Sequence, residues 1–144
     1  MTPEEIKEKV RELITRDPVV YVLGTVDANN APQMRFMGAL VLEGDFEVLM
    51  ATSSSARKVQ QIQVNPQAQL LFSSDDYKQV ATLSGTAKMV ESLDRKKMFW
   101  DKVPACADYH ESPEDPDFGV IAVKAKRIEY LDVTQGLEPM RVEL

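Results

Sequence analysis

Six segments of this chain are rich in β-branched and aromatic residues, and short runs of turn residues separate most of them. The segments are 19–26, 33–42, 46–50, 68–73, 79–90 and 121–133. Short turns join antiparallel strands, whereas parallel strands need a crossover of a dozen or more residues. The pattern therefore predicts a mainly β fold: a six-stranded antiparallel sheet curled into a barrel, and not a doubly wound parallel sheet.

Three short helices are expected beside this sheet. Thr2-Pro3-Glu4-Glu5 is a typical helix start, with Thr2 as N-cap and Glu5 completing a capping box. The apolar residues that follow at helical spacing predict a lid on the core, and Asp17-Pro18 ends the helix. Ser92 can cap another helix, which holds Phe99 and Trp100. Within strand 79–90, Gly85 indicates a bulge or the close approach of another group.

Length and charge narrow the class of protein. The chain has 144 residues, which fits one domain, residues 1–144, with one hydrophobic core. Its net charge of −6 argues against nucleic acid or an anionic membrane as the main partner. No apolar run is long enough to cross a bilayer, and the N-terminus is acidic and helical instead of resembling a signal peptide. The expected location is the cytoplasm.

Cysteine and histidine occur once each, as Cys106 and His110. These counts exclude an internal disulfide, a multi-thiolate metal site and a multi-histidine metal centre, so we expect no metal. A cysteine–histidine nucleophile pair is conceivable at this spacing, but Pro104 disfavours a regular helix there and no third orienting group is evident. We interpret the two residues as a small apolar thiol and a surface imidazole. Residues 103–118, which are acidic and contain prolines, are interpreted as a solvated loop.

The stretch from Ala51 to Pro66, ATSSSARKVQQIQVNP, carries the strongest functional signal. Three serines, 53–55, stand where a strand gives way to a short amphipathic helix, and Arg57 and Lys58 occupy its first turn. Unpaired N–H groups at a helix start attract anions, while cations are unfavourable there unless an anion is bound. The residues thus fit a phosphate site. The alternative is a serine N-cap followed by two solvated cations.

The order of these features resembles the FMN-binding split-barrel family related to pyridoxamine 5′-phosphate oxidase, especially its general-stress-protein branch. A strand with Arg35 precedes the strand 46–50 and the motif Thr52-Ser53-Ser54-Ser55-Ala56-Arg57-Lys58. Asn65-Pro66, Gly85-Thr86-Ala87 and a closing strand from Asp115 to Tyr130 follow. The resemblance spans roughly residues 5–133. There is no glycine-rich dinucleotide fingerprint and no Walker motif.

The resemblance implies a six-stranded split β-barrel that forms a homodimer with two FMN molecules at the subunit interface. Arg57 and Lys58 would then bind the FMN phosphate, and Arg35 would contact the phosphate or the ribityl chain. The alternative for Arg35 is an exposed cation on a sheet edge. Residues 50–52 would run beside the isoalloxazine ring, and Gln79 would reach the site from the second subunit. The full set of implied cofactor-binding residues is Arg35, Met50, Ala51, Thr52, Ser53, Ser55, Arg57, Lys58 and Gln79.

The chain also departs from the oxidase itself. Ala51 replaces an aromatic residue, Leu40 replaces a lysine, and the basic C-terminal motif that holds the substrate phosphate is missing. Oxidation of pyridoxamine phosphate is therefore not expected. The leading hypothesis is an FMN-dependent oxidoreductase acting on a small-molecule electron donor or acceptor, with no catalytic side chain identified. The alternatives are a flavin-binding stress or sensor protein without turnover, a split barrel that binds deazaflavin, and an empty dimeric module.

Overall fold

The computed structural model describes all 144 residues and contains eight strands, three α-helices and one 3-10 helix. In chain order the elements are α1 (Pro3–Ile14), β1 (Tyr21–Val26), β2 (Pro32–Met37), β3 (Val41–Glu43), β4 (Glu47–Ser53), α2 (Arg57–Val64), β5 (Gln67–Ser73), β6 (Gln79–Met89), α3 (Leu93–Lys102), η1 (Pro104–Asp108), β7 (Phe118–Asp132) and β8 (Met140–Glu143).

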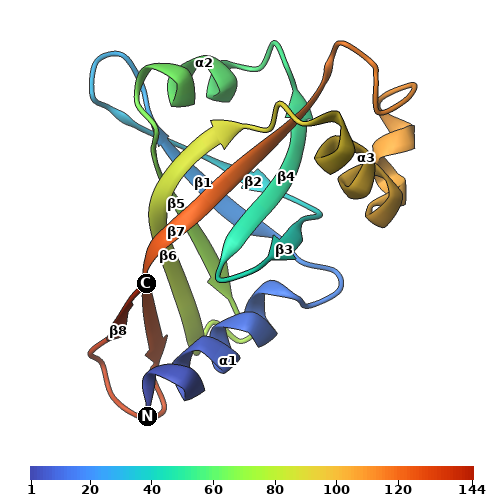
Figure 1. Cartoon of the computed structure of the whole chain (residues 1–144). Coiled ribbons are helices and arrows are strands. Elements are labelled where there is room, and N and C mark those ends of the chain that lie inside the picture. Colours follow the sequence, from blue (N-terminus) through green and yellow to red (C-terminus); the bar gives the residue numbers. More distant parts are fainter.

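The strands form one antiparallel, curved sheet in the order β2-β1-β5-β6-β7-β4-β3, and β8 pairs with the second half of β7. β2 and β3 lie at the two ends of this order and do not pair with each other, so the barrel stays open. Helices α1 and α2 lie at opposite ends of the curved sheet, and α3 lies beside β4 (Figure 1). The expected split barrel with a few short flanking helices is confirmed.

The structure has two more strands than the sequence predicts. The expected strand 33–42 is divided into β2 and β3, because residues 38–40 leave the ladder between them. β8 lies in the tail, where the sequence signal is weak, and its residues become a strand by pairing with β7. β7 also begins at Phe118, earlier than expected, because 118–120 pair with the end of β4.

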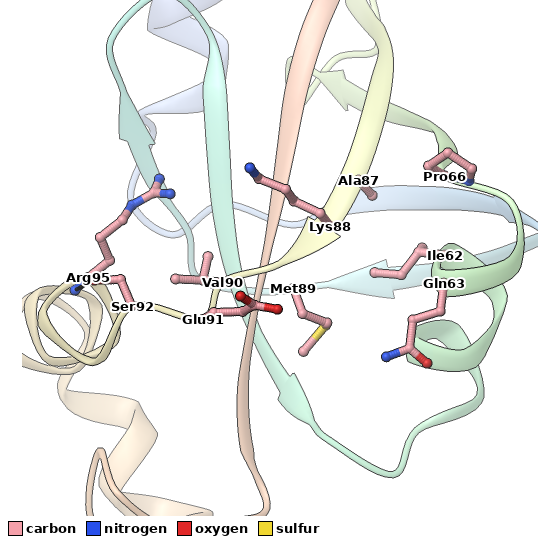
Figure 2. Close-up of a pocket in the computed structure, with 10 residues that line it drawn as sticks. All are labelled: Ile62, Gln63, Pro66, Ala87, Lys88, Met89, Val90, Glu91, Ser92 and Arg95. Carbon is pink, nitrogen blue, oxygen red and sulfur yellow. Dashed lines mark hydrogen bonds between the residues drawn. The ribbon is translucent and has the colours of Figure 1, made fainter.

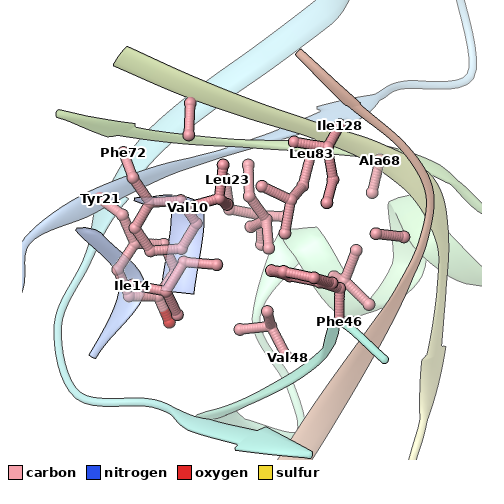
Figure 3. Packing of buried hydrophobic residues seen from close by; sticks show 14 of the residues in the cluster. Val10, Ile14, Tyr21, Leu23, Phe46, Val48, Ala68, Phe72, Leu83 and Ile128 are labelled. Atoms are coloured by element: carbon pink, nitrogen blue, oxygen red, sulfur yellow. The ribbon is translucent and has the colours of Figure 1, made fainter. Parts of the chain in front are cut away.

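Two hydrophobic cores cover the two faces of β4 and β7. The larger, with 22 buried residues, fills the inside of the curved sheet, where the rings of Tyr21 and Phe72 stack 4.9 Å apart (Figure 3). The smaller, with nine buried residues, lies between the outer face of these strands and α3 and includes Phe99 and Phe118. Because both faces are covered, residues 118–123 are buried without alternation.

The starts of α1 and α3 follow the local sequence closely. The Thr2 hydroxyl accepts from the Glu5 backbone N–H at 3.2 Å, and the Glu5 carboxylate accepts from the Thr2 N–H at 3.2 Å, so the capping box is confirmed. The apolar face of α1 is buried in the larger core, as expected for a lid. Ser92 caps α3. None of the helices combines the length and the apolar character that crossing a bilayer requires.

Gly85 marks a bulge where two backbones come unusually close. The register between β6 and β7 shifts between Ser84 and Gly85. A Cβ atom at Gly85 would lie 1.9 Å from the carbonyl oxygen of Lys124, far inside van der Waals contact. The two predicted reasons for this glycine, a bulge and the close approach of another group, are therefore both confirmed. A larger residue would fit at this position only if β7 moved.

We therefore expect Gly85→Ala to lower the free energy of unfolding by about 1–3 kcal/mol or more, the usual cost of forcing atoms into a packed site. The matched control is Gly38→Ala, whose Cβ would meet nothing within 4 Å and which should change stability by less than about 0.5 kcal/mol. Urea unfolding followed by circular dichroism measures both. Equal stability of the two variants would contradict this account of the bulge.

Candidate functional site

The end of β4 and the start of α2 form a sharp corner. β4 ends at Ser53, and α2 begins at Arg57 with Ala56 as its N-cap, which makes no side-chain capping bond. The backbone N–H groups of Arg57 and Lys58 therefore have no hydrogen-bond partner in the chain. The alternative in which a serine caps this helix is wrong. An uncapped helix start with free N–H groups remains, which is a favourable place for an anion.

The serines of the motif contact the acidic loop that precedes β7. The Ser53 hydroxyl donates to Asp117 Oδ1 at 2.5 Å and lies 3.1 Å from the Ser55 hydroxyl. The Ser54 backbone N–H donates to the Asp117 carbonyl at 2.9 Å. A phosphate beside the Ser53 hydroxyl would be repelled by the Asp117 carboxylate. Ser53 and Ser55 could therefore bind a phosphate only after the hydrogen bond between Ser53 and Asp117 opens. Their role as ligands stays a prediction.

Arg35 is held in place by neutral acceptors on β1 and α2. Its Nη1 donates to Thr25 Oγ1 at 2.8 Å and to the Leu23 carbonyl at 3.1 Å, and its Nη2 donates to Gln61 Oε1 at 3.0 Å. Thr25, which is buried, in turn donates its hydroxyl to Gln61 Oε1 at 2.6 Å. β2 is an edge strand, but Arg35 is half-buried and immobilised, so the exposed-cation alternative is wrong. Its remaining guanidinium donors are free for a ligand.

Arg35, Arg57 and Lys58 form a cluster of cations that no carboxylate neutralises. None of the three has a carboxylate within 4.0 Å, although the chain carries a net charge of −6. The Lys58 ammonium donates to Thr52 Oγ1 at 3.1 Å. Burial, and then the positive charge of Arg35, lower the pKa of Lys58; burial and the charge of Arg57 lower the pKa of Arg35. A bound anion would reverse both repulsive effects.

The remaining predicted residues lie in three different places. The Met50 side chain is fully buried in the larger core, so only its backbone can approach a ligand. Ala51 and Thr52 line a cavity on the outer side of β4. Gln79 pairs with Asp132 at the far end of β7, whereas Ser53 pairs with Phe118 at its start, so one chain does not bring Gln79 to the corner.

The cavity beside β4 has a volume of about 590 Å³ and is lined on its other side by residues of α3 and η1. Cys106 lies in its wall and is buried, and burial raises the pKa of its thiol, which confirms the apolar-thiol interpretation. His110 also lines the cavity, and its side chain is only 9% exposed. The interpretation of His110 as a surface imidazole is wrong, because the acidic loop folds over the ring.

Thr25, Gln61 and His110 were not among the predicted site residues. Thr25 could have been found, because the alternation of β1 places it on the same inward face as Tyr21 and Leu23, where a hydroxyl needs a partner. Gln61 carries no comparable signal, since it is one of several glutamines on a short polar helix. His110 depends on the path of an irregular loop, which no periodicity describes.

Another cavity of about 590 Å³ lies among α2, β6 and the start of α3 (Figure 2). Its charged residues are Lys88, Glu91 and Arg95, and the Arg95 guanidinium already forms ion pairs with Glu43 and Glu47. None of the residues predicted for the site lines this cavity. The corner between β4 and α2, with the cavity beside β4, is therefore the better candidate.

Comparison with known proteins points to one family. A family model described as pyridoxamine 5′-phosphate oxidase matches residues 6–132. The crystal structure of General Stress Protein 26 from Bacillus anthracis str. Sterne is 26% identical, with a TM-score of 0.80 over 97% of this chain and 99% of that chain. No curated protein matches the chain.

Two further solved structures share the fold at lower identity. A Clostridium acetobutylicum protein related to general stress protein 26 of B. subtilis (pyridoxinephosphate oxidase family) is 22% identical, with a TM-score of 0.84 over 99% of this chain and 97% of that chain. A pyridoxamine 5′-phosphate oxidase-related, FMN binding protein from Nostoc punctiforme PCC 73102 is 16% identical, with a TM-score of 0.71 over 98% of this chain and 89% of that chain.

Proposed function

This chain belongs to the pyridoxamine 5′-phosphate oxidase family, and on that premise we propose that it binds FMN and acts, as a homodimer, as an oxidoreductase on a small molecule. The observation that carries the flavin assignment is the cluster formed by Arg35, Arg57 and Lys58. Gathering three cations without a carboxylate is unfavourable in the free protein and becomes favourable when a dianionic phosphate is bound. A cytoplasmic location is part of the proposal and stays a prediction.

The residues present at the corner fit the phosphate of FMN. Arg57 and Lys58 would supply charge and two free backbone N–H groups, and the fixed guanidinium of Arg35 would supply a planar pair of donors. Ala51 and Thr52, which line the cavity next to the corner, would lie beside the ring. When bound, FMN would provide the electron transfer, while the chain binds, orients and shields it.

The second subunit completes this site in the proposal. Gln79, which the family resemblance places near FMN, lies at the opposite end of β7 from the corner, so it could contribute only from another copy. The outer face of β2, β1 and β5 carries a row of cross-strand neighbours, Phe36, Val22 and Leu71, with Met34 beside them. Met34 and Phe36 are 74% and 78% exposed, which is unusual for large apolar residues unless a partner covers them.

The cavity beside β4 favours an oxidoreductase over a protein that only binds flavin. Its volume of about 590 Å³ lies within the range of known ligand sites and would admit a small molecule next to the proposed ring position. Its lining contains no lysine or arginine, and its charged wall residue is the carboxylate of Asp117. A phosphorylated substrate would be repelled there, which argues against pyridoxamine phosphate oxidation and agrees with the missing C-terminal motif.

The flavin assignment predicts that the purified protein binds FMN more tightly than riboflavin, which lacks the phosphate. Arg57→Ala combined with Lys58→Ala should weaken FMN binding at least about 100-fold, because two charge-assisted contacts are lost, and should leave riboflavin binding unchanged. Flavin fluorescence titration measures both affinities, and circular dichroism confirms the fold. The matched control is Lys124→Ala with Lys126→Ala, two exposed cations on β7. Unchanged FMN affinity in the corner variant would overturn the assignment.

Turnover is tested separately on the flavin-loaded protein. We expect a nicotinamide donor to bleach the flavin absorbance and a small-molecule acceptor to restore it. Flavin absorbance that stays unchanged when the donor is added would instead favour the non-enzymatic sensor.

The dimer assignment predicts that Phe36→Ser combined with Met34→Ser yields a monomer, because the variant removes the two most exposed apolar side chains of this face. Leu137→Ser is the control, since Leu137 is 82% exposed but lies in the loop between β7 and β8 and is not part of this row. Light scattering after size-exclusion chromatography should give twice the chain mass for the wild type and the control. A wild-type monomer, or a double variant that stays dimeric, would refute this choice of interface.

A further inference from the structure

Asp117 places a carboxylate against the serines that follow β4. Its Oδ1 accepts from the Ser53 hydroxyl at 2.5 Å, and that hydroxyl lies 3.1 Å from the hydroxyl of Ser55. A carboxylate oxygen and a phosphate oxygen are both anionic acceptors, so they take the same hydroxyl donors. In the free chain, an anion of the protein itself therefore occupies the serine side of the corner between β4 and α2.

This internal carboxylate does not reach the three cations of the corner. No ion pair within 4.0 Å joins Asp117 to any of them. The two sides of the corner are nevertheless adjacent, because Thr52, whose hydroxyl accepts from the Lys58 ammonium at 3.1 Å, directly precedes Ser53. A phosphate bound by the cations would therefore lie near the Asp117 carboxylate, and the two anions would repel each other.

The backbone of Asp117 is fixed, while its side chain has room to rotate. Its carbonyl accepts from the Ser54 N–H at 2.9 Å, and its own N–H donates to Asp115 Oδ1 at 2.9 Å. The side chain, in contrast, is 53% exposed. A change of rotamer can thus take the carboxylate away from Ser53 while the loop before β7 keeps its backbone hydrogen bonds.

His110 offers this carboxylate a second position. Asp117 Oδ2 lies 3.9 Å from Nδ1 of the ring, and Nδ1 is sealed from solvent without a hydrogen-bond partner. An approach of about 1 Å would bring the two atoms to hydrogen-bond distance. Asp115 Oδ2 is equally far from Nδ1, but the Asp115 carboxylate is held by the backbone N–H groups of Glu111 at 3.1 Å and Asp117 at 2.9 Å. The mobile partner of the pair is therefore Asp117, and a bond to His110 would satisfy a buried polar atom.

We propose that Asp117 is an internal competitor for the phosphate site. Its carboxylate binds Ser53 in the free chain, and a bound phosphate moves it from Ser53 to Nδ1 of His110. The source of the phosphate, FMN, rests on the proposed function. Once Asp117 has moved, the hydroxyls of Ser53 and Ser55 become donors for the phosphate. Asp117 thereby lowers the affinity for ligands that carry a phosphate and leaves the affinity for riboflavin unchanged.

Asp117→Asn tests the competition, because it keeps the shape of the side chain and an acceptor for Ser53 but removes the charge. We expect FMN to bind about five- to tenfold more tightly, since a neutral hydrogen bond is weaker than a charge-assisted one and the repulsion is gone. Riboflavin affinity should not change. The matched control is Glu114→Gln, which removes one charge from the same loop at a residue paired with Lys97 at 3.4 Å, and which should leave FMN affinity unchanged. Flavin fluorescence titration measures all four affinities.

The movement toward His110 is tested with inorganic phosphate on the wild-type chain. The imidazole ¹⁵N NMR signals of the single histidine are followed during the titration. We expect these signals to shift, because Nδ1 gains a hydrogen bond. Phosphate has no aromatic ring and so cannot shift them by a ring current. Sodium chloride at the same ionic strength is the control and should leave the signals in place.

Unchanged or weaker FMN binding by folded Asp117→Asn would overturn the proposal, as would an equal gain in Glu114→Gln. Histidine signals that stay fixed at saturating phosphate would overturn it even if Asp117→Asn does not fold. A wild-type chain that binds phosphate with the histidine shift but does not bind FMN would defeat the proposed function and leave the role of Asp117 standing. A chain that binds neither would overturn both.

Discussion

The electrostatic repulsion among Arg35, Arg57 and Lys58 is the constraint from which the functional account follows. Arg35 is fixed by a threonine hydroxyl, a glutamine amide and a backbone carbonyl, none of which cancels its charge. Lys58 is fixed by a hydroxyl in the same way. Folding thus holds the cations in place and leaves the neutralising charge to be supplied from outside. A phosphate at an uncapped helix start meets that requirement with charge and with backbone donors together.

The long strand β7 places the other parts of the site around this corner. Its first half is buried on both faces, so it carries the larger core on one side and the smaller core with α3 on the other. The loop just before it supplies Asp117, which accepts a hydrogen bond from Ser53 at the corner and lines the cavity beside β4. Its far end pairs with Gln79, too far along the sheet to serve the same corner. The exposed row on β2, β1 and β5 is where we propose that a second copy brings that residue in.

Features that depend on a few neighbouring residues could be predicted from the sequence. The Thr2 capping box and the bulge at Gly85 follow from local propensity. The antiparallel pairing of strands that short turns connect follows from turn chemistry. The corner residues Arg57 and Lys58 were also recognised, because their position at a helix start is visible in the sequence. β8 was missed, since its few residues are stabilised by pairing with β7 and not by their own pattern.

Features that depend on contacts between distant segments could not be predicted. Asp117 lies 64 residues from Ser53 in the chain and accepts the hydrogen bond of its hydroxyl, and α2 begins after Ala56 with no serine as its cap. Gln61 reaches Arg35 from a helix that is 26 residues away in the chain. His110 is covered because Asp115 folds the acidic loop back on itself through backbone hydrogen bonds. Each contact is set by the tertiary path of the chain, which hydrophobic periodicity does not describe.

The most direct measurement of the central claim is a crystal structure of the protein grown with FMN. The account predicts that the phosphate oxygens lie within hydrogen-bond distance of the Arg35 guanidinium, the Lys58 ammonium and the backbone N–H groups at the start of α2. A phosphate bound elsewhere, with these three cations still facing solvent, would contradict it.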